Sequence, residues 1–469
     1  MATRLTCHDG WVKGEPRVVV VANRLPVRRE GDNWEVSPGG LVSALTPILE
    51  KRDGSWVGWT GIPDFSHPPF TLEGIEQRPV LLSAEELETF YLGFCNGTIW
   101  PLYHDALRTP EFHRHWWRPY VAANQRFAEE AAAATDNGDV VWVQDYQLQL
   151  VPAMLRRLRS DISIGFFLHI PFPAIELFAR LPWRTQMLEG LLGADVIAFQ
   201  TRLAAQNFAR AAVRFTSATG TTRQLEYEGR TIRIQVAPIS IDTARYRAMA
   251  GSEEVEEITR RLRADLGPDR IILLGVDRLD YTKGIDVRLR AFETLLTTNP
   301  ELARRAVLVQ VAVPSREEIE DYVEMRNKVE QLTGRINGEF GDSEWTPVLY
   351  LYRNLPPEEL IAYYRVADVM IVTPLRDGMN LVCKEFVASR VDGDGVLVLS
   401  EFAGAAQELG DAIIVNPHDL DGTAAALEKA MTLPPKEARR RMARMRAVVE
   451  RQDVFGWAAD CLAALGVET

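Results

Sequence analysis

The sequence predicts an α/β protein built from two doubly wound domains. Apolar runs of strand length alternate with helical patterns, which is typical of a parallel sheet with crossover helices. The alternation begins at residues 17–25 and begins again at residue 271, after a charged helical stretch over residues 243–266. The chain of 469 residues is also too long for one compact core, so two domains of about 200 residues or more are expected.

Continuous apolar runs mark the strands, because parallel strands are buried on both faces. The first series is residues 17–25, 139–145, 162–170, 195–200 and 232–239, with helical patterns at 112–134 and 150–159. The second series is residues 271–279, 306–313, 347–352, 366–373, 395–400 and 412–417, followed by a helical segment over 441–465. We therefore place a first domain at 1–240 and a second at 241–450, with a helix in 451–469 that crosses back onto the first.

Composition and charge exclude several classes of function. The chain is 46% apolar and 25% charged, and its formal net charge is −12, which argues against a nucleic-acid or anionic-membrane partner. A local cluster of Arg and Lys can still hold an anionic small substrate. The four cysteines are far apart and form no CxxC pair, which indicates a reduced compartment. No apolar run approaches ~18 residues and the first residues resemble no signal peptide, so we expect a cytoplasmic protein.

Candidate site residues follow predicted strands, because ligands of doubly wound domains sit at the carboxyl ends of the strands. Asn23-Arg24 ends the first strand. Asp145 and His169 each follow a later one, and a structural role for them stays open. Gly39-Gly40 precede a helical pattern, where glycines let backbone N–H groups approach an anion, although a plain glycine turn also fits.

Two basic residues lie at the end of the first predicted strand of the second domain. Arg278 and Lys283 lie five apart across a turn that opens a helix, an arrangement suited to a diphosphate. The alternative is a surface ion pair of Arg278 with Asp277 or Asp280.

The segment PLRDGMNLVCKEFVASR, residues 374–390, joins a predicted strand to a predicted helix. Asp377, Asn380 and Glu385 within it fit either helix capping or a polar ligand site.

No metal site is predicted. Asp392 and Asp394 follow a helix rather than a strand and are expected to form a turn. His113 and His115 have a spacing that does not converge on a metal from a helix. The chain also lacks GxGxxG and GxxxxGK[ST], so it carries no dinucleotide fingerprint and no P-loop.

Seven blocks together resemble one family, the retaining glycosyltransferases that make trehalose 6-phosphate. The blocks are ANRLPV, SPGGLVSAL, FFLHIPFP, VDRLDYTKGI, RINGEFG, TPLRDGMNLVCKEFVA and LSEFAGAAQELG, and they extend over about residues 17 to 460. The resemblance implies a GT-B fold, in which two Rossmann-like domains face a central cleft. It also implies an NDP-glucose donor, glucose 6-phosphate as acceptor, no cofactor and no metal. We further expect a homo-oligomer.

The resemblance also implies roles for individual residues. On the acceptor side the residues are Arg24, Trp56, Tyr91, Trp100, Asp145 and Arg316, with Arg24 and Arg316 on the phosphate. On the donor side they are Gly40, Arg278, Lys283, Leu355, Asp377, Gly378, Met379, Asn380, Leu381 and Glu385, with Glu385 on the ribose. The residues expected nearest the chemistry are Arg278, Lys283, Asp145 and His169.

One departure from the family pattern is visible. Many members read His-Asp-Tyr-His where this chain reads Gln144-Asp145-Tyr146-Gln147, so a role of the flanking histidines is absent here. Two alternatives keep the fold: another acceptor, as in glucosylglycerol-phosphate synthases or cyclitol-coupling pseudo-glycosyltransferases, and a non-catalytic sugar-phosphate sensor. The base of the donor nucleotide is open between uracil, guanine and adenine.

Overall fold

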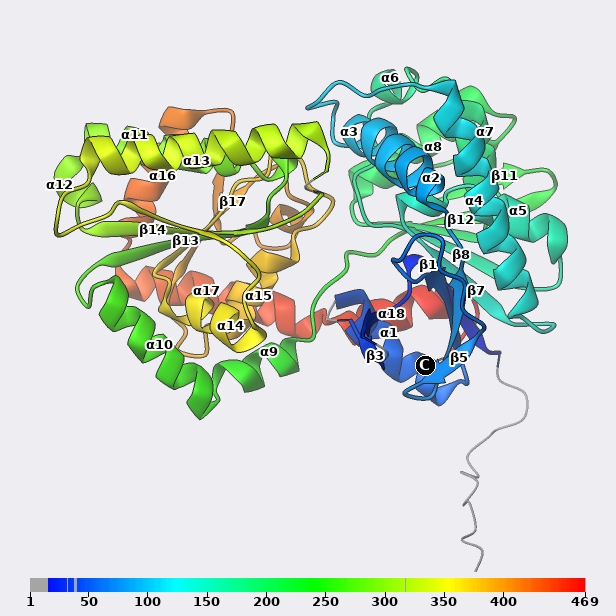
Figure 1. Ribbon diagram of the computed structural model, residues 1–469, viewed down its shortest axis with the longest axis horizontal. Helices are drawn as coiled ribbons and strands as arrows, with labels where there is room; N and C mark the ends of the chain where they lie inside the picture. Colours follow the sequence, from blue (N-terminus) through cyan, green and yellow to red (C-terminus); the bar gives the residue numbers. More distant parts are fainter. Residues whose placement is uncertain (1–15, 32, 38–39, 317, 469) are drawn as a thin grey trace, which may run out of the picture.

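The computed structural model describes residues 16–468 apart from 32, 38–39 and 317. Each half of the chain is built on its own sheet, with helices on both faces (Figure 1). A loop at about residues 237–242 leads from the first sheet into the helices of the second half. The predicted pair of Rossmann-like domains facing a cleft is confirmed.

The first sheet has a parallel centre, with two antiparallel pairings at one edge and one at the other. From edge to edge its strands are β10 (Thr219–Gly220), β11 (Gln224–Tyr227), β12 (Arg230–Val236), β9 (Val196–Phe199), β8 (Ser163–Leu168), β7 (Val140–Gln144), β1 (Val18–Arg24), β4 (Ser55–Trp59), β6 (Ile75–Val80) and β5 (Phe70–Leu72). A separate hairpin joins β2 (Val27–Glu30) to β3 (Asn33–Val36).

The second sheet is parallel throughout. Its order is β15 (Val348–Tyr352), β14 (Ala306–Val313), β13 (Ile271–Arg278), β16 (Val369–Val372), β17 (Val396–Ser400) and β18 (Ile413–Val415). Counted along the chain this is the order 3-2-1-4-5-6, which reverses between β13 and β16. Ligands of such sheets bind at that reversal, outside the carboxyl ends of the strands.

The helices alternate with the strands as predicted. In the first half they are α1 (Gly40–Lys51), α2 (Ala84–Glu86), the π-helix η1 (Leu87–Ile99), α3 (Trp100–Tyr103), α4 (Arg114–Ala133), the 3₁₀ turn η2 (Tyr146–Leu148), α5 (Val151–Leu158), α6 (Ile175–Phe178), α7 (Arg184–Leu191) and α8 (Arg202–Phe215). In the second half they are α9 (Thr243–Ala250), α10 (Glu253–Leu266), η3 (Tyr281–Lys283), α11 (Ile285–Thr298), α12 (Pro300–Ala303), α13 (Glu320–Phe340), α14 (Pro357–Val366), α15 (Leu381–Ser389), η4 (Gly404–Gln407), α16 (Leu420–Met431), α17 (Pro435–Arg451) and α18 (Val454–Ala464).

The helical segment predicted over 441–465 is two helices rather than one. The side chain of Asp453 accepts a hydrogen bond from the backbone N–H of Gly456 at 2.7 Å and so caps a new helix, α18. This helix lies beside α1 in the first half (Figure 1). The indole of Trp457 on α18 donates to the Ala237 carbonyl at 3.1 Å and packs on Trp142, with ring centroids 5.1 Å apart.

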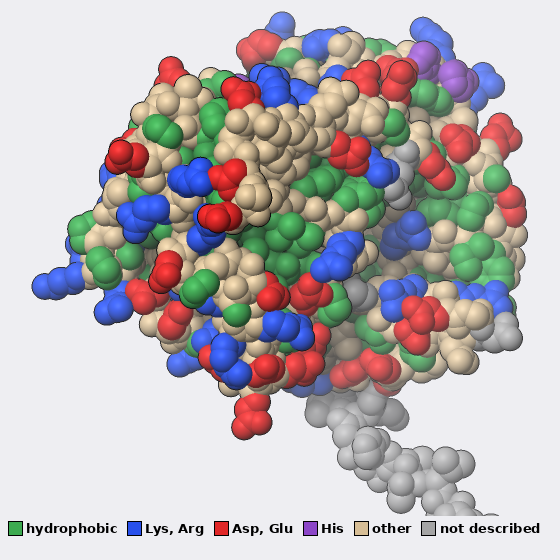
Figure 2. Space-filling model, turned by 60° about the vertical axis from the view of Figure 1, so that its left-hand side comes forward, with side chains coloured by type: hydrophobic (Ala, Val, Ile, Leu, Met, Phe, Trp, Pro, Cys, Tyr) green, Lys and Arg blue, Asp and Glu red, His purple; other side chains and the backbone are tan. Residues whose placement is uncertain are grey.

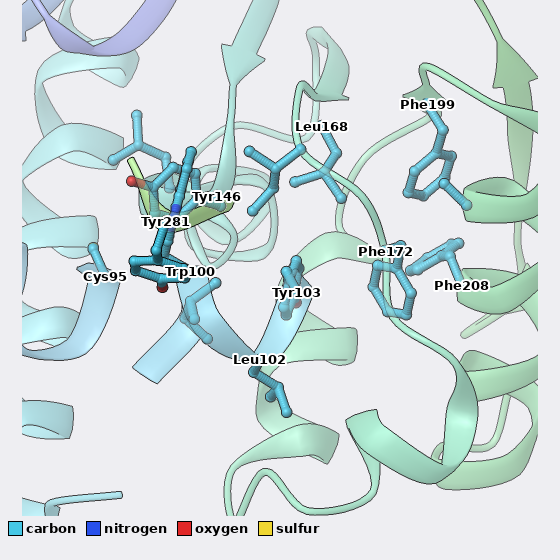
Figure 3. Close-up of a cluster of buried hydrophobic side chains, with 14 of the residues drawn as sticks. Cys95, Trp100, Leu102, Tyr103, Tyr146, Leu168, Phe172, Phe199, Phe208 and Tyr281 are labelled. Carbon is cyan, nitrogen blue, oxygen red and sulfur yellow. The ribbon is translucent and has the colours of Figure 1, made fainter. Parts of the chain in front are cut away.

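Contacts between the halves also lie near the cleft. Figure 3 shows Tyr281 from η3 beside Trp100 and Tyr146 of the first half, within one buried aromatic cluster. Ion pairs extend this contact at its rim. Arg376 meets Asp105 at 3.2 Å, and Arg108 meets Asp321 and Glu324 on α13 at 3.5 and 3.2 Å.

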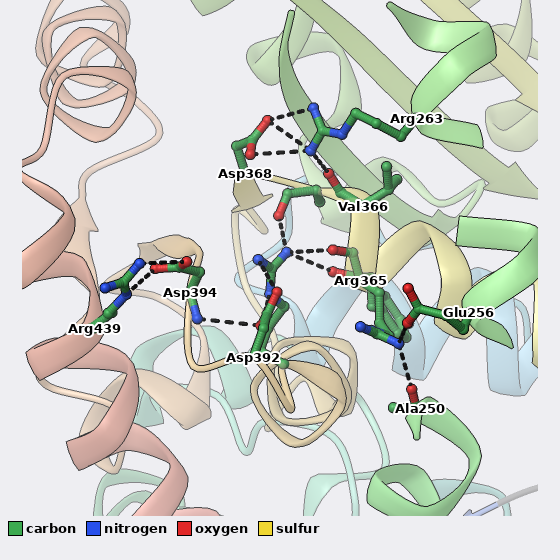
Figure 4. A network of polar contacts seen from close by, with 12 residues as sticks. Ala250, Glu256, Arg263, Arg365, Val366, Asp368, Asp392, Asp394 and Arg439 are labelled. Atoms are coloured by element: carbon green, nitrogen blue, oxygen red, sulfur yellow. Dashed lines mark hydrogen bonds and ion pairs between the residues drawn. The ribbon is translucent and has the colours of Figure 1, made fainter. Parts of the chain in front are cut away.

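Away from the cleft, a charged network fastens the helices of the second half to one another (Figure 4). Arg263 on α10 pairs with Asp368 at 3.3 Å, and Arg439 on α17 pairs with Asp394 at 2.9 Å. Asp392 and Asp394 therefore form a structural turn, as predicted. None of the described helices is long and apolar enough to cross a membrane.

Candidate functional site

A cavity of about 810 Å³ lies where the carboxyl ends of the two sheets face each other. Most of the predicted site residues line it. These are Arg24, Trp56, Tyr91, Trp100, Asp145, His169, Arg278, Lys283, Arg316, Asp377, Met379, Asn380 and Leu381. The fold therefore brings together side chains that are up to about 360 positions apart in the sequence (Leu381 and Arg24), and several of them lie at strand ends.

The side chains at the reversal point of the second sheet are strongly charged. Lys283 follows β13, and its ammonium lies 2.6 Å from a carboxylate oxygen of Asp377, which follows β16. Both side chains are 13% exposed. Burial alone would raise the pKa of Asp377, but the ion pair with Lys283 outweighs it and the pKa is lowered. Asp377 is therefore an ionised, acceptor-only group, which suits it to sugar hydroxyls.

Arg278 has no ion-pair partner in the described part of the chain. The two candidate partners are engaged elsewhere, because Asp277 pairs with the buried Arg288 at 2.8 Å and Asp280 faces Arg316 at 3.8 Å. The alternative of a surface ion pair at Arg278 is therefore wrong. Its exposed guanidinium lies 5.9 Å from the Trp100 ring, at the cavity wall.

Asn380 performs both functions that the sequence left open. Its side-chain oxygen accepts from the backbone N–H of Cys383 at 3.2 Å, which caps α15. Its side-chain nitrogen donates to Asp377 at 3.2 Å. The capping residue and the cavity wall are thus the same residue.

Arg316 bridges the two halves of the chain. One guanidinium nitrogen donates to the Tyr146 hydroxyl at 3.1 Å, and the other contacts the Tyr322 hydroxyl. The guanidinium also lies 4.1 Å from the Trp100 ring. With a left-handed backbone (φ 49°) and these contacts, the positive charge of Arg316 is held in one place.

Arg24 supplies a second cation at the end of β1. Its guanidinium lies 4.3 Å from the centre of the Trp59 ring. A side chain at Gly61 would collide with it, since an added Cβ would lie 1.7 Å from a guanidinium nitrogen. Burial lowers the pKa of Arg24. A bound anion would raise this pKa again, because it would place a negative charge beside the guanidinium.

Asp145 and His169 end neighbouring strands and contact each other. A carboxylate oxygen of Asp145 accepts from the backbone N–H of His169 at 3.1 Å. Burial raises the pKa of Asp145 to about 6 and lowers that of the His169 imidazole to about 3. His169 is therefore neutral near pH 7. Its Nε2 lies 2.9 Å from the amide oxygen of Gln144, so position 144 supports this ring although it is not a histidine.

Among the described residues, three predicted donor residues do not line the cavity: Gly378, Glu385 and Leu355. Gly378 lets the two halves of the chain approach closely because it has no side chain. An added Cβ would lie 2.2 Å from the His169 carbonyl oxygen across the cleft. Glu385 accepts from the Tyr364 hydroxyl at 2.8 Å, and burial raises its pKa. Leu355 lies half-buried in the loop after β15. Gly40 is the first residue of α1, and its neighbour Gly39 lies outside the described residues.

Sequence reasoning missed other cavity residues, of which His104 and Tyr146 are the clearest. His104 follows Trp100 by one helical turn, a spacing that could have indicated that the two share a face. No cluster of three or more His, Cys, Asp or Glu side chains suited to a metal ion occurs among the described residues. On the face shown in Figure 2, basic and acidic side chains are interspersed.

The fold and the site together define a glycosyltransferase of the GT-B type. The model of glycosyltransferase family 20 matches residues 16–466, and the chain belongs to this family. It is 50% identical to trehalose-6-phosphate synthase of Mycolicibacterium smegmatis, over 97% of this chain and 94% of that protein.

Solved structures give the same result. The E. coli protein bound with UDP-2-fluoro glucose is 35% identical, with a TM-score of 0.89 over 96% of this chain and 98% of that one. The UDP-forming α,α-trehalose-phosphate synthase of Burkholderia xenovorans, in complex with glucose 6-phosphate, is 34% identical. Its TM-score is 0.88, over 96% of this chain and 100% of that one.

Proposed function

We propose that this chain transfers glucose, with retention, from UDP-glucose to glucose 6-phosphate, giving α,α-trehalose 6-phosphate and UDP. The observation that carries the proposal is the cavity between the two sheets, which has an acceptor-side pair of arginines and a donor-side cluster of Arg278, Lys283 and Asp377. The relatives and solved structures that share the fold support the two substrates and the uracil base.

On the acceptor side, Arg24 and Arg316 hold the 6-phosphate, with Tyr91 beside it. Two guanidinium groups suit a phosphate dianion because each can donate two parallel hydrogen bonds. Trp56 and Trp100 form apolar walls for the sugar ring, and Asp145 accepts from one of its hydroxyls.

On the donor side, Arg278 and Lys283 neutralise the diphosphate, and Asp377 accepts from glucose hydroxyls. The backbone N–H groups of Met379 and Asn380 approach the sugar from the same loop. Glu385, one helical turn further into α15, holds the ribose. Because Glu385 does not line the cavity in this structure, this role requires the donor to reach the far side of α15 or the helix to turn slightly.

Transfer proceeds by attack on the face that the leaving group departs from. The acceptor hydroxyl oxygen forms a bond to the anomeric carbon, the bond from that carbon to the phosphate oxygen breaks, and the hydroxyl proton passes to the same phosphate oxygen. The protein positions the two substrates and stabilises the charge on the departing UDP through Arg278 and Lys283.

We also propose that the reaction needs no cofactor and no metal ion, since two basic side chains supply the positive charge beside the diphosphate. Unchanged turnover after treatment with EDTA is the expected result. The protein is further expected to be cytoplasmic and homo-oligomeric, which fractionation and light scattering would test.

A panel of substrates tests the proposed function. The chain is incubated with glucose 6-phosphate and UDP-, GDP- or ADP-glucose in turn, and release of each nucleoside diphosphate is measured. UDP release that depends on glucose 6-phosphate is expected. UDP release only with glycerol 3-phosphate or a cyclitol phosphate would indicate another acceptor, and no release with any donor would indicate a sensor.

A further inference from the structure

His104 is a buried cavity residue to which the proposed mechanism gives no role. It follows the short helix α3 (Trp100–Tyr103) and is 2% exposed. Its ring packs against Trp100, with centroids 4.2 Å apart, and the side chain lines the cavity. Figure 3 shows the Trp100 ring that it packs on, at the domain contact.

One hydrogen bond fixes which ring nitrogen carries the proton. The Nδ1 atom of His104 lies 2.8 Å from the backbone carbonyl oxygen of Trp100. A carbonyl oxygen only accepts, so Nδ1 must carry the hydrogen. Burial lowers the pKa of His104 to about 4, so the ring is neutral near pH 7 and Nε2 is left as an acceptor. Among the described residues Nε2 has no hydrogen-bond partner.

The surroundings place this acceptor on the donor side of the cavity. The charges of Asp280 and Asp377 act on the His104 ring, and so does that of Lys283. His104 belongs to the first half of the chain, whereas these three belong to the second. His104 therefore lines the same cavity as Asp377, the carboxylate proposed to bind the donor glucose, but belongs to the opposite half of the chain.

We propose that Nε2 of His104 accepts a hydrogen bond from a hydroxyl of the donor glucosyl group. The first half of the chain would thereby bind the donor sugar from the side opposite Asp377. A hydroxyl can donate to such an atom. The inference rests on the proposed glucosyl transfer and adds a specificity residue to it.

Two substitutions separate this role from simple support of Trp100. In His104→Asn the amide reaches only the Nδ1 position, so the bond to the Trp100 carbonyl can persist while the acceptor is lost. In His104→Gln the amide oxygen reaches the Nε2 position. We expect kcat/KM to fall on the order of tenfold in the Asn variant, and by less than about threefold in the Gln variant. The reverse order would overturn the proposal.

Deoxy donors give the direct test. UDP-glucose lacking the 2-, 3-, 4- or 6-hydroxyl is assayed with the wild type and with His104→Asn. For one donor, the loss seen in the wild type should vanish in the variant, because the hydrogen bond is already absent. If all four losses persist unchanged in the variant, His104 contacts no donor hydroxyl.

A structure of the wild type with UDP-2-fluoro glucose keeps the proposal testable if the variants fail to fold. Nε2 should lie about 3 Å from the 3-, 4- or 6-hydroxyl oxygen or from the fluorine that replaces the 2-hydroxyl, and a separation beyond about 4 Å from all of them would overturn the proposal. Failure of the proposed function is distinguishable, since it would leave the wild type inactive with every donor.

Discussion

Removing Lys283 should harm both turnover and stability, whereas removing Arg278 should harm turnover alone. The two cations are proposed to neutralise the same diphosphate, and loss of one such stabiliser costs about 10²- to 10³-fold in kcat. They differ in what they touch without ligand. Lys283 pairs with the buried Asp377, and Arg278 has no ion-pair partner among the described residues.

The expected size of the stability effect follows from that pair. Breaking a buried ion pair by removing one partner costs about 3–5 kcal/mol, because the other charge is left uncompensated. Lys283→Ala should therefore unfold several degrees below the wild type, since about 1 kcal/mol shifts Tm by roughly 2–4 °C in domains of this size. Arg278→Ala should melt within about 1 °C of the wild type, as exposed substitutions usually change stability by less than about 0.5 kcal/mol.

A double variant gives the control. Lys283→Ala combined with Asp377→Asn removes both charges, so Tm should partly recover while turnover stays low. Turnover is measured as UDP release and Tm by calorimetry without ligand. Near-normal turnover in Arg278→Ala, or an unchanged Tm in Lys283→Ala, would refute the reasoning.

Three further substitutions have equally definite outcomes. Because burial raises the pKa of Asp145, the folded chain holds that proton longer than the unfolded chain, and stability is lost as pH rises from about 4 to 6. The free energy of unfolding in urea should therefore favour Asp145→Asn over the wild type more at pH 7 than at pH 4.5. A difference between the two proteins that is the same at both pH values would contradict this. Gly378→Ala should lower kcat/KM about tenfold or more, because the added Cβ meets the His169 carbonyl at 2.2 Å, whereas Gly334→Ala has open space and should be normal; equal kinetics for the two would count against close approach of the halves. Lys384→Met should lower the free energy of unfolding, measured by calorimetry, by about 3–5 kcal/mol, because it breaks the buried ion pair of Lys384 with Glu408 at 2.8 Å. A loss under about 1 kcal/mol would contradict that.

The sequence was most informative where one physical rule dominates. Strands buried on both faces are continuous apolar runs, so β1, β7 and β13 were found close to their true ends. The strand β4, SWVGW, is as buried but is short and contains Gly and Ser, so its pattern gave little signal. The order of the strands in each sheet depends on tertiary packing, which no local pattern encodes.

The candidate site divides in the same way. Arg278 ends β13 and Asp377 follows β16, and the strand-end rule placed both in the cavity. His104 follows a helix, and its tautomer depends on a contact that only the fold reveals. Glu385 lies on α15 as expected, but its carboxylate turns toward Tyr364 rather than into the cavity. Which way a helical side chain points is decided by packing, not by its spacing along the chain.

The reaction product tests the central claim most directly. Wild-type protein is incubated with UDP-glucose and glucose 6-phosphate, and the product is examined by NMR spectroscopy alongside UDP release. We predict one UDP released per disaccharide phosphate formed, with both anomeric centres in the α configuration. A β linkage at the transferred glucose, or UDP release with no disaccharide formed, would contradict the account.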